Sequence, residues 1–287
     1  MSGLLIQPSA TALTAAPVPA IITRRIRFVT NAAAGAKVRR VFGHPRPCIA
    51  VEEAVGPGEL PAPKTWPEPT EPLDVVFVAK GATAMDASWL ASPEHPEAAP
   101  AVVVEWEGRS IHWRPGRALV QGDPAGQEES LAALIDFAFY EGELRTLEQS
   151  LEVGEADAHA DVARAYRIRW RDRKHWARIR EMIESLARLR LVYARLAPRL
   201  AKGSRSLPRG SRRVMGCLLR KADVAARMEA VSSRLEACED LYEGASDRIN
   251  DYRGWFTGHM LEIIIILLLL IEVVFFAADL FLRFLDM

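Results

Sequence analysis

Residues 259–287 read HMLEIIIILLLLIEVVFFAADLFLRFLDM, an almost unbroken apolar run that decides how the rest of the chain is interpreted. As an α-helix, the stretch from Leu261 to Leu282 would rise about 33 Å, and the hydrocarbon core of a bilayer is about 30 Å thick. Side chains typical of membrane interfaces precede this run: Tyr252, Trp255, Phe256 and His259. The buried helix of a soluble domain is the alternative, but length and composition favour a transmembrane helix over residues 259–284.

Acidic residues interrupt the apolar run. Glu262 falls at the near interface, whereas Glu272 falls close to mid-span, where an ionised acid costs roughly 2.5 to 3.5 kcal/mol. Asp279 lies on the same helical face as Glu272, and Arg283 follows it by four residues, which suits an ion pair. Glu272 could avoid this cost by being protonated in lipid. It could also avoid it by forming a hydrogen bond to a second copy of the chain. We favour the oligomer because intramembrane ionisable residues usually face protein or a water path.

Flanking charges predict which side of the membrane holds most of the protein. Arg248 and Arg253 precede the span and Arg283 follows it, so the positive-inside rule places the preceding chain in the cytoplasm. Three cysteines without CxxC spacing suit a reducing compartment, and the excess of arginine over lysine suggests a GC-rich bacterial genome. The prediction is a single-pass protein of the bacterial inner membrane, with residues 1–18 as a flexible leader and not a signal peptide.

The remainder of the chain divides by composition into two parts. Residues 19–122 carry short β-like runs between proline and glycine clusters: IITRRIRFV, CIAVE, LDVVFVA, AVVVEW and SIHW. VVVEWEGRSIHW predicts a hairpin with its turn at residues 107–109. After the QGDPAGQ linker the pattern becomes helical, and a helical hairpin plus a stalk helix is predicted over residues 127–258. The predicted fold class is α+β: a small N-terminal α+β domain, long coiled-coil-like helices and one transmembrane helix.

Three apolar seams with alternating spacings of three and four residues predict the long helices. The first runs from Phe137 to Leu151, with Gly154 as its expected end. The second occupies residues 179–200 and is expected to end at the following KGSRSLPRGS segment. The third begins at Val224 and continues in register into the apolar run. The last soluble helix is therefore expected to enter the bilayer as one rod.

Charge is sorted between the first two helices, the first acidic and the second, over residues 164–202, basic. An antiparallel pair would place the opposite charges side by side. The basic helix could instead contact RNA or anionic lipid, because guanidinium groups neutralise phosphates and Trp170 and Trp176 are interleaved. Pairing with the acidic helix is favoured, since the necessary acids lie in the same chain. The candidate phosphate or lipid contacts are Arg167, Arg169, Arg171, Arg173, Lys174 and Arg178.

The ending LEIIIILLLLIEVVFF, with RLEACEDLYEGASDRINDYRGW before it, resembles the C-terminus of the required-for-meiotic-nuclear-division family, a sporulation-type family with a domain of unknown function. Members of that family begin the anchor with a Leu-Glu pair and have a second Glu ten residues later, which match Leu261, Glu262 and Glu272. The FAFYEGELRTLEQSLE stretch also matches an aromatic-rich helix of the family. The resemblance implies inner-membrane oligomers that support translation, with no enzymatic activity or cofactor.

No phosphate-binding loop, dinucleotide fingerprint, HExxH or GxSxG motif occurs, and His44, Cys48 and His112 lack partner ligands. We therefore predict no catalytic, cofactor or metal site. An ion channel of the CorA type would need a second span and a Gly-Met-Asn signature, and an enzyme has no supporting residues. The prediction is a membrane-anchored oligomeric scaffold or tether whose partners are the lipid bilayer, further copies of itself and, through the basic helix, RNA, the ribosome or anionic lipid.

Overall fold

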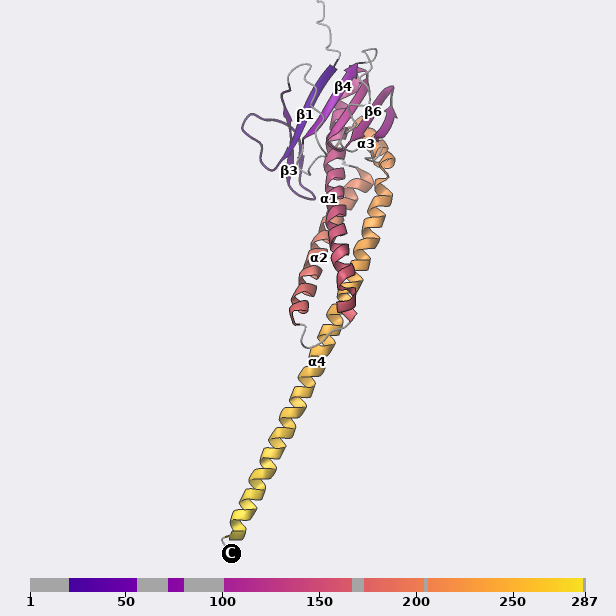
Figure 1. The fold of residues 1–287 in the computed structure, drawn as a ribbon. Coiled ribbons are helices and arrows are strands. Elements are labelled where there is room, and N and C mark those ends of the chain that lie inside the picture. The colour runs from indigo at the N-terminus through magenta and orange to yellow at the C-terminus, as the bar shows by residue number, and fades with distance from the viewer. Residues whose placement is uncertain (1–20, 56–71, 80–100, 167–172, 204–205, 286–287) are drawn as a thin grey trace, which may run out of the picture. The chain divides into compact units, whose positions relative to one another are not determined.

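The computed structural model of this chain describes residues 21–55, 72–79, 101–166, 173–203 and 206–285, so the predicted leader lies outside it (Figure 1). The chain forms two compact units. One contains residues 1–140 and 202–222, and the other contains residues 141–201 and 223–287. The first unit therefore adds two helical segments to the predicted N-terminal domain, and the helix α1 (Gln127–Tyr166) contributes to both units.

The first unit is built on a mixed sheet with the strand order β2-β3-β1-β4-β7-β6-β5 among the described residues. The strands are β1 (Ile21–Val29), β2 (Lys37–Phe42), β3 (Cys48–Glu53), β4 (Leu73–Ala79), β5 (Val102–Trp106), β6 (Arg109–Arg114) and β7 (Arg117–Gly122). All neighbours pair antiparallel except β4 and β7, which are parallel. This sheet, followed by long helices, confirms the predicted α+β fold class.

The central strand β4 explains where the core lies. Six consecutive residues of LDVVFVA are buried, so both faces of this strand are covered, as expected for a continuous apolar run inside a sheet. On one face Val76 and Val78 pack with Leu119. On the other face Phe42 of β2 stacks on Phe139 of α1, with ring centroids 4.0 Å apart. Aromatic packing thus places the first part of α1 on the sheet.

The hairpin predicted from VVVEWEGRSIHW is confirmed. β5 pairs with β6 in the register that joins Trp106 to Arg109, and the turn residues Glu107 and Gly108 have φ angles of 48° and 73°. Positive φ at both central positions is the geometry of a type I′ turn, one of the two favoured turns of two-residue hairpins. The turn directs the side chain of Arg109 into the protein, where it is only 5% exposed.

Arg109 fixes the start of α1. Its Nη1 donates to the Gly126 carbonyl oxygen at 2.5 Å and to Ser130 Oγ at 3.2 Å. Gly126 ends the short 3-10 helix η2 (Pro124–Gly126) that leads into α1. A Cβ on Gly126 would lie 1.9 Å from Arg109 Nη1, and one on Gly122 would lie 2.6 Å from Arg109 Cγ. Both positions therefore require glycine because the arginine occupies the space.

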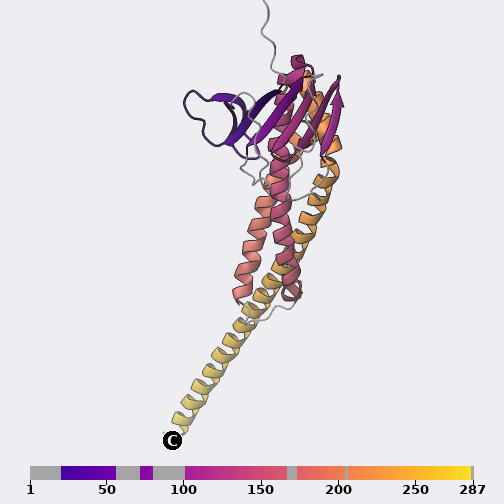
Figure 2. The same ribbon diagram turned by 45° about the horizontal axis from the view of Figure 1, so that its top comes forward.

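Three further helices complete the two units. The first unit also contains α3 (Arg209–Lys221), which packs against β5. The second unit contains the later part of α1 with α2 (Arg173–Lys202) and α4 (Val224–Leu285). In both views α2 and the later part of α1 lie side by side (Figures 1 and 2). The continuity of α4 confirms that the third apolar seam and the apolar run belong to one helix.

The expected end of α1 at Gly154 is wrong, because the helix continues to Tyr166. A glycine inside a helix costs only about 1 kcal/mol relative to alanine, and tertiary contacts of the following turns outweigh that cost. Those contacts are made by Glu155, Asp157 and Asp161. Sequence patterns also did not predict β2, β7 or α3.

Replacing Gly126 with alanine is expected to lower the free energy of unfolding by about 1 to 3 kcal/mol, because the new methyl group would overlap the held guanidinium of Arg109. Urea unfolding of the detergent-solubilised protein measures the change. Gly142→Ala is the matched control: a Cβ there meets nothing within 4 Å, so it should stabilise α1 by up to about 1 kcal/mol. Equal stabilisation by both alanines would contradict the proposed role of Arg109.

Candidate functional site

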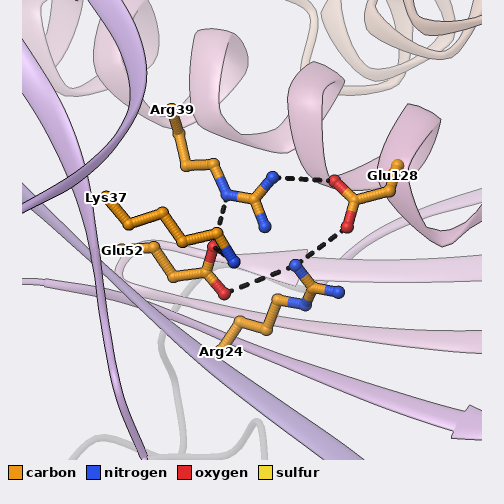
Figure 3. Close-up of polar contacts among 5 residues, drawn as sticks. All are labelled: Arg24, Lys37, Arg39, Glu52 and Glu128. Atoms are coloured by element: carbon orange, nitrogen blue, oxygen red, sulfur yellow. Dashed lines mark hydrogen bonds and ion pairs between the residues drawn. The ribbon is translucent and has the colours of Figure 1, made fainter.

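Five charged side chains meet where strands β1, β2 and β3 face the first turn of α1 (Figure 3). Glu52 of β3 is the centre of this cluster, because three cations surround its carboxylate. Lys37 Nζ lies 2.9 Å from Glu52 Oε2, Arg24 Nη1 lies 3.3 Å from Oε1, and Arg39 donates to the same group. Glu128 of α1 joins the cluster from the helix, 2.9 Å from Arg24 Nη1 and 3.0 Å from Arg39 Nη1.

The two carboxylates of the cluster differ in their exposure to solvent. The Glu52 side chain is 12% exposed, whereas that of Glu128 is 60% exposed. Burial raises the pKa of Glu52, but hydrogen bonds from Arg39 and Lys37 outweigh burial, so its pKa lies below the ordinary value. Each of the three cations contacts a carboxylate of this same chain. The arrangement is therefore suited to fastening α1 to the sheet, and not to holding an external anion.

A second charged array joins α1 to α4 within the second unit. Glu148 and Glu155 are seven residues apart on α1, and Arg227 and Arg234 are seven apart on α4. Arg227 Nη2 lies 2.6 Å from Glu148 Oε2, and Arg234 Nε donates to Glu155 Oε1 at 2.6 Å. Residue numbers increase together along both helices, so α1 and α4 run parallel here. The hydrogen bond from Arg234 lowers the pKa of Glu155 below its ordinary value.

Polar side chains, of which Asp161 and Tyr242 are buried, connect α2 to the same bundle. Arg178 of α2 donates to Asp161 Oδ2 and to Asp157 Oδ1 of α1, both at 2.8 Å. The buried hydroxyl of Tyr242 on α4 also donates to Asp161 Oδ2, at 3.3 Å. Burial raises the pKa of Tyr242 well above its ordinary value. Arg190 of α2 adds a pair with Glu239 of α4 at 2.6 Å.

One of the predicted phosphate or lipid contacts takes part in these pairs. Arg178 is engaged by carboxylates of α1, which is the alternative that the charge pattern favoured for the basic helix. Arg167, Arg169 and Arg171 lie outside the described residues. Arg173 and Lys174 belong to α2, but their side chains are not described. Their contact with phosphate stays a prediction.

The far part of α4 differs completely from its packed part. Ile249 is the last buried residue of the helix within the described range, and from Met260 to Phe276 every apolar side chain is between 42% and 72% exposed. Among the described residues, α4 is the one helix whose length and composition would let it cross a membrane. Such a long exposed apolar surface is unstable in water and stable in lipid.

The predicted intramembrane polar residues occupy distinct positions on α4. Glu262 Oε2 lies 3.2 Å from His259 Nδ1, and the His259 ring stacks on Trp255 with centroids 4.9 Å apart. Glu272 is exposed within the apolar run and has no hydrogen-bond or ion-pair partner among the described residues. α4 also includes Asp279 and Arg283, whose side chains are not described.

One basic surface was missed at the level of sequence. α3 exposes five cations: Arg209, Arg212, Arg213, Arg220 and Lys221. A signal for it was present, because residues 185–222 contain eleven arginines and lysines and no aspartate or glutamate. The helix was overlooked because glycine and proline at its start favoured a loop.

Candidate chemistry elsewhere is sparse. Within the described ranges no group of three or more His, Cys, Asp or Glu side chains could hold a metal ion. His112 Nε2 lies 2.8 Å from Ser110 Oγ on β6, and Cys48 is buried and reduced. A scan against protein-family models and a search of curated proteins found no match to this chain. The family resemblance therefore rests on the quoted residues alone.

Acid is expected to weaken the first unit through Glu52. Its folded pKa lies below the unfolded value of about 4.3, so its ion pairs contribute stability above that pH and lose it as pH falls through the folded pKa. Glu52→Gln should lower the melting temperature at pH 7 and flatten its decline below about pH 4.3. Glu128→Gln, at an exposed position, is the control with a small effect. An unchanged acid profile for Glu52→Gln would contradict this assignment.

Proposed function

We propose that this protein is a membrane-anchored, homo-oligomeric tether that holds its first unit away from the bilayer. The observation that carries the proposal is the exposed apolar part of α4, which continues without a break from the packed part of the same helix. A helix whose apolar side chains are exposed from Met260 to Phe276 needs lipid or protein to cover it.

The length of α4 sets the distance that the proposed tether spans. Val224 and Leu261 are 37 residues apart, which corresponds to about 55 Å at 1.5 Å per residue. Ion pairs and hydrogen bonds from Arg227, Arg234 and Tyr242 hold this part of α4 against α1. A helix supported in this way stays straight where a lone helix would bend or fray. The packed part of α4 thus acts as a spacer that precedes the apolar run.

The flanking groups support an orientation with the two units in the bacterial cytoplasm. Arg248 and Arg253 lie on the packed side of the apolar run, and positive residues concentrate on the cytoplasmic side of membrane helices. Trp255 and His259 lie between these arginines and the apolar residues, at the level where amphipathic rings favour the interface. The resemblance to inner-membrane proteins of the sporulation-type family agrees with this placement.

Glu272 supports the oligomer. It lies among exposed apolar side chains without a partner in the described part of its own chain. A carboxyl group in lipid is costly unless it is protonated and hydrogen-bonded. A neighbouring copy of α4 supplies the same group at the same depth, so two or more copies can satisfy each other by symmetry. No catalytic step is part of this proposal.

Full-length protein is expected to stay in the membrane pellet after alkaline carbonate extraction, because the apolar run is held by the hydrocarbon core. A chain ending at Arg253 should be released into the supernatant and remain folded, since no buried described residue lies beyond Ile249. Circular dichroism of the truncated chain checks that it is folded. Release of the full-length protein by carbonate would contradict the anchor.

Glu272→Leu is expected to insert as well as the wild type but to form smaller particles in the same detergent. Each lost hydrogen bond between copies contributes about 1 to 2 kcal/mol at most, and a symmetric assembly loses one for every copy. Glu272→Gln retains hydrogen-bonding capacity and should keep the wild-type particle mass. Multi-angle light scattering measures the masses, and an unchanged mass for Glu272→Leu would argue against an oligomer held by this residue.

A further inference from the structure

The basic surface of α3 is a continuous face of an amphipathic helix. Arg209, Arg213 and Arg220 follow one another at spacings of four and seven residues, so they project within about 40° of one direction over roughly 17 Å. Arg212 and Lys221 flank this row. The buried residues lie on the opposite face: Ser211, Val214, Met215, Leu218 and Leu219. The apolar face thus belongs to the core of the first unit, and the cations face solvent.

These cations are not used within the chain as other arginines are. Arg24, Arg39, Arg178 and Arg227 each pair with at least two carboxylates. In contrast, no carboxylate of the described residues lies within ion-pair distance of any α3 cation. Arg213 lies over the partly exposed ring of Trp106, 6.0 Å from its centroid, and Arg220 reaches only the Cys217 thiol at 3.3 Å.

The two glycines of α3 have different surroundings. A Cβ on Gly210 would lie 2.6 Å from the Glu129 carboxylate, so a larger residue there would displace that side chain. A Cβ on Gly216 would meet nothing within 4 Å. Gly216 lies on the basic face between Arg213 and Arg220, where packing does not require glycine. Bare backbone among cations lets a sugar-phosphate chain approach closely.

We propose that the basic face of α3, with Trp106 at its edge, is a docking surface for single-stranded RNA. Arginine side chains neutralise backbone phosphates, and an aromatic ring beside them offers a surface for an unstacked base. Glu129 lies against Gly210 at the start of α3, but Glu129 and Glu107 pair with Arg109, and no described acid forms an ion pair with an α3 cation. This inference adds a class of partner, RNA, to the proposed tether. It depends on the proposed membrane anchor only in the argument that excludes lipid.

The bilayer that holds α4 is too far away to be the partner. Only Ala222 and Asp223 join α3 to α4, and Val224 is about 55 Å from Leu261 along the helix. A helix tilted by about 40° still leaves roughly 40 Å, and α3 itself is about 20 Å long. The remaining 20 Å exceeds the Debye length of about 8 Å at physiological salt. Lipid-binding amphipathic helices also need a free apolar face, which α3 lacks.

Fluorescence anisotropy with a labelled mixed-sequence RNA of about 20 nucleotides tests the proposal on full-length protein in zwitterionic nanodiscs. With about four phosphates neutralised, wild-type affinity should fall roughly 50-fold between about 50 and 200 mM salt. The variant carrying Arg209→Gln, Arg212→Gln and Arg220→Gln should bind roughly tenfold more weakly or worse, with the logarithmic salt slope reduced by about 2. Its melting temperature should match the wild type, because the three side chains are exposed.

The matched control removes the same charge from the exposed face of α2 through Arg180→Gln, Arg188→Gln and Arg195→Gln, and should bind RNA as the wild type does. Three results would overturn the proposal: no RNA binding by the wild type, an equal loss in the α2 control, or equal binding of duplex DNA. Loss of phosphatidylglycerol vesicle binding in the α3 variant, with RNA binding unchanged, would reassign the surface to lipid. Carbonate extraction tests the membrane anchor separately. A failure of the RNA proposal can therefore be distinguished from a failure of the anchor proposal.

Discussion

A carboxylate that leaves water needs a positive partner, and this constraint acts most strongly on α1. Asp136, Glu141 and Asp161 of this helix are buried. Each is paired by an arginine from a different element: Arg40 of β2, Arg227 of α4 and Arg178 of α2. Removing one partner from such a pair would leave a buried charge, at a cost of about 3 to 5 kcal/mol. The acids of α1 therefore select which elements pack beside it and in which register.

The geometry of these pairs matters more than their number. Arg40 contacts Asp136 through two nearly equal bonds of 2.8 and 2.9 Å, a bidentate arrangement that fixes orientation as well as distance. Buried ion pairs add little net stability compared with apolar packing, but a mismatched pair is costly. We infer that their role here is specificity. Glu148 and Glu155 repeat every seven residues opposite Arg227 and Arg234, so sliding α4 by one turn would break both pairs.

The same constraint separates two kinds of arginine. Those facing α1 are already neutralised by the chain, and this leaves little charge for an external anion at the Glu52 cluster. Those on α3 face solvent without an ion pair to a described carboxylate, and the apolar side chains of α4 from Met260 to Phe276 are exposed. The buried acids of α1 are thus paired within the chain. The exposed cations of α3 and the exposed apolar side chains of α4 are the surfaces available to partners.

The sequence by itself determined the strands with strong β-like runs, the hairpin at Glu107 and the continuity of α4, because hydropathy and turn chemistry are local properties. It did not determine β2, because KVRRVF looks too polar for a sheet until Arg39 and Arg40 meet Glu52 and Asp136. Only the tertiary structure decided which arginines are paired. Arg40 and Asp136 are 96 residues apart, and no local pattern reports whether a charge will find its partner or remain in solvent.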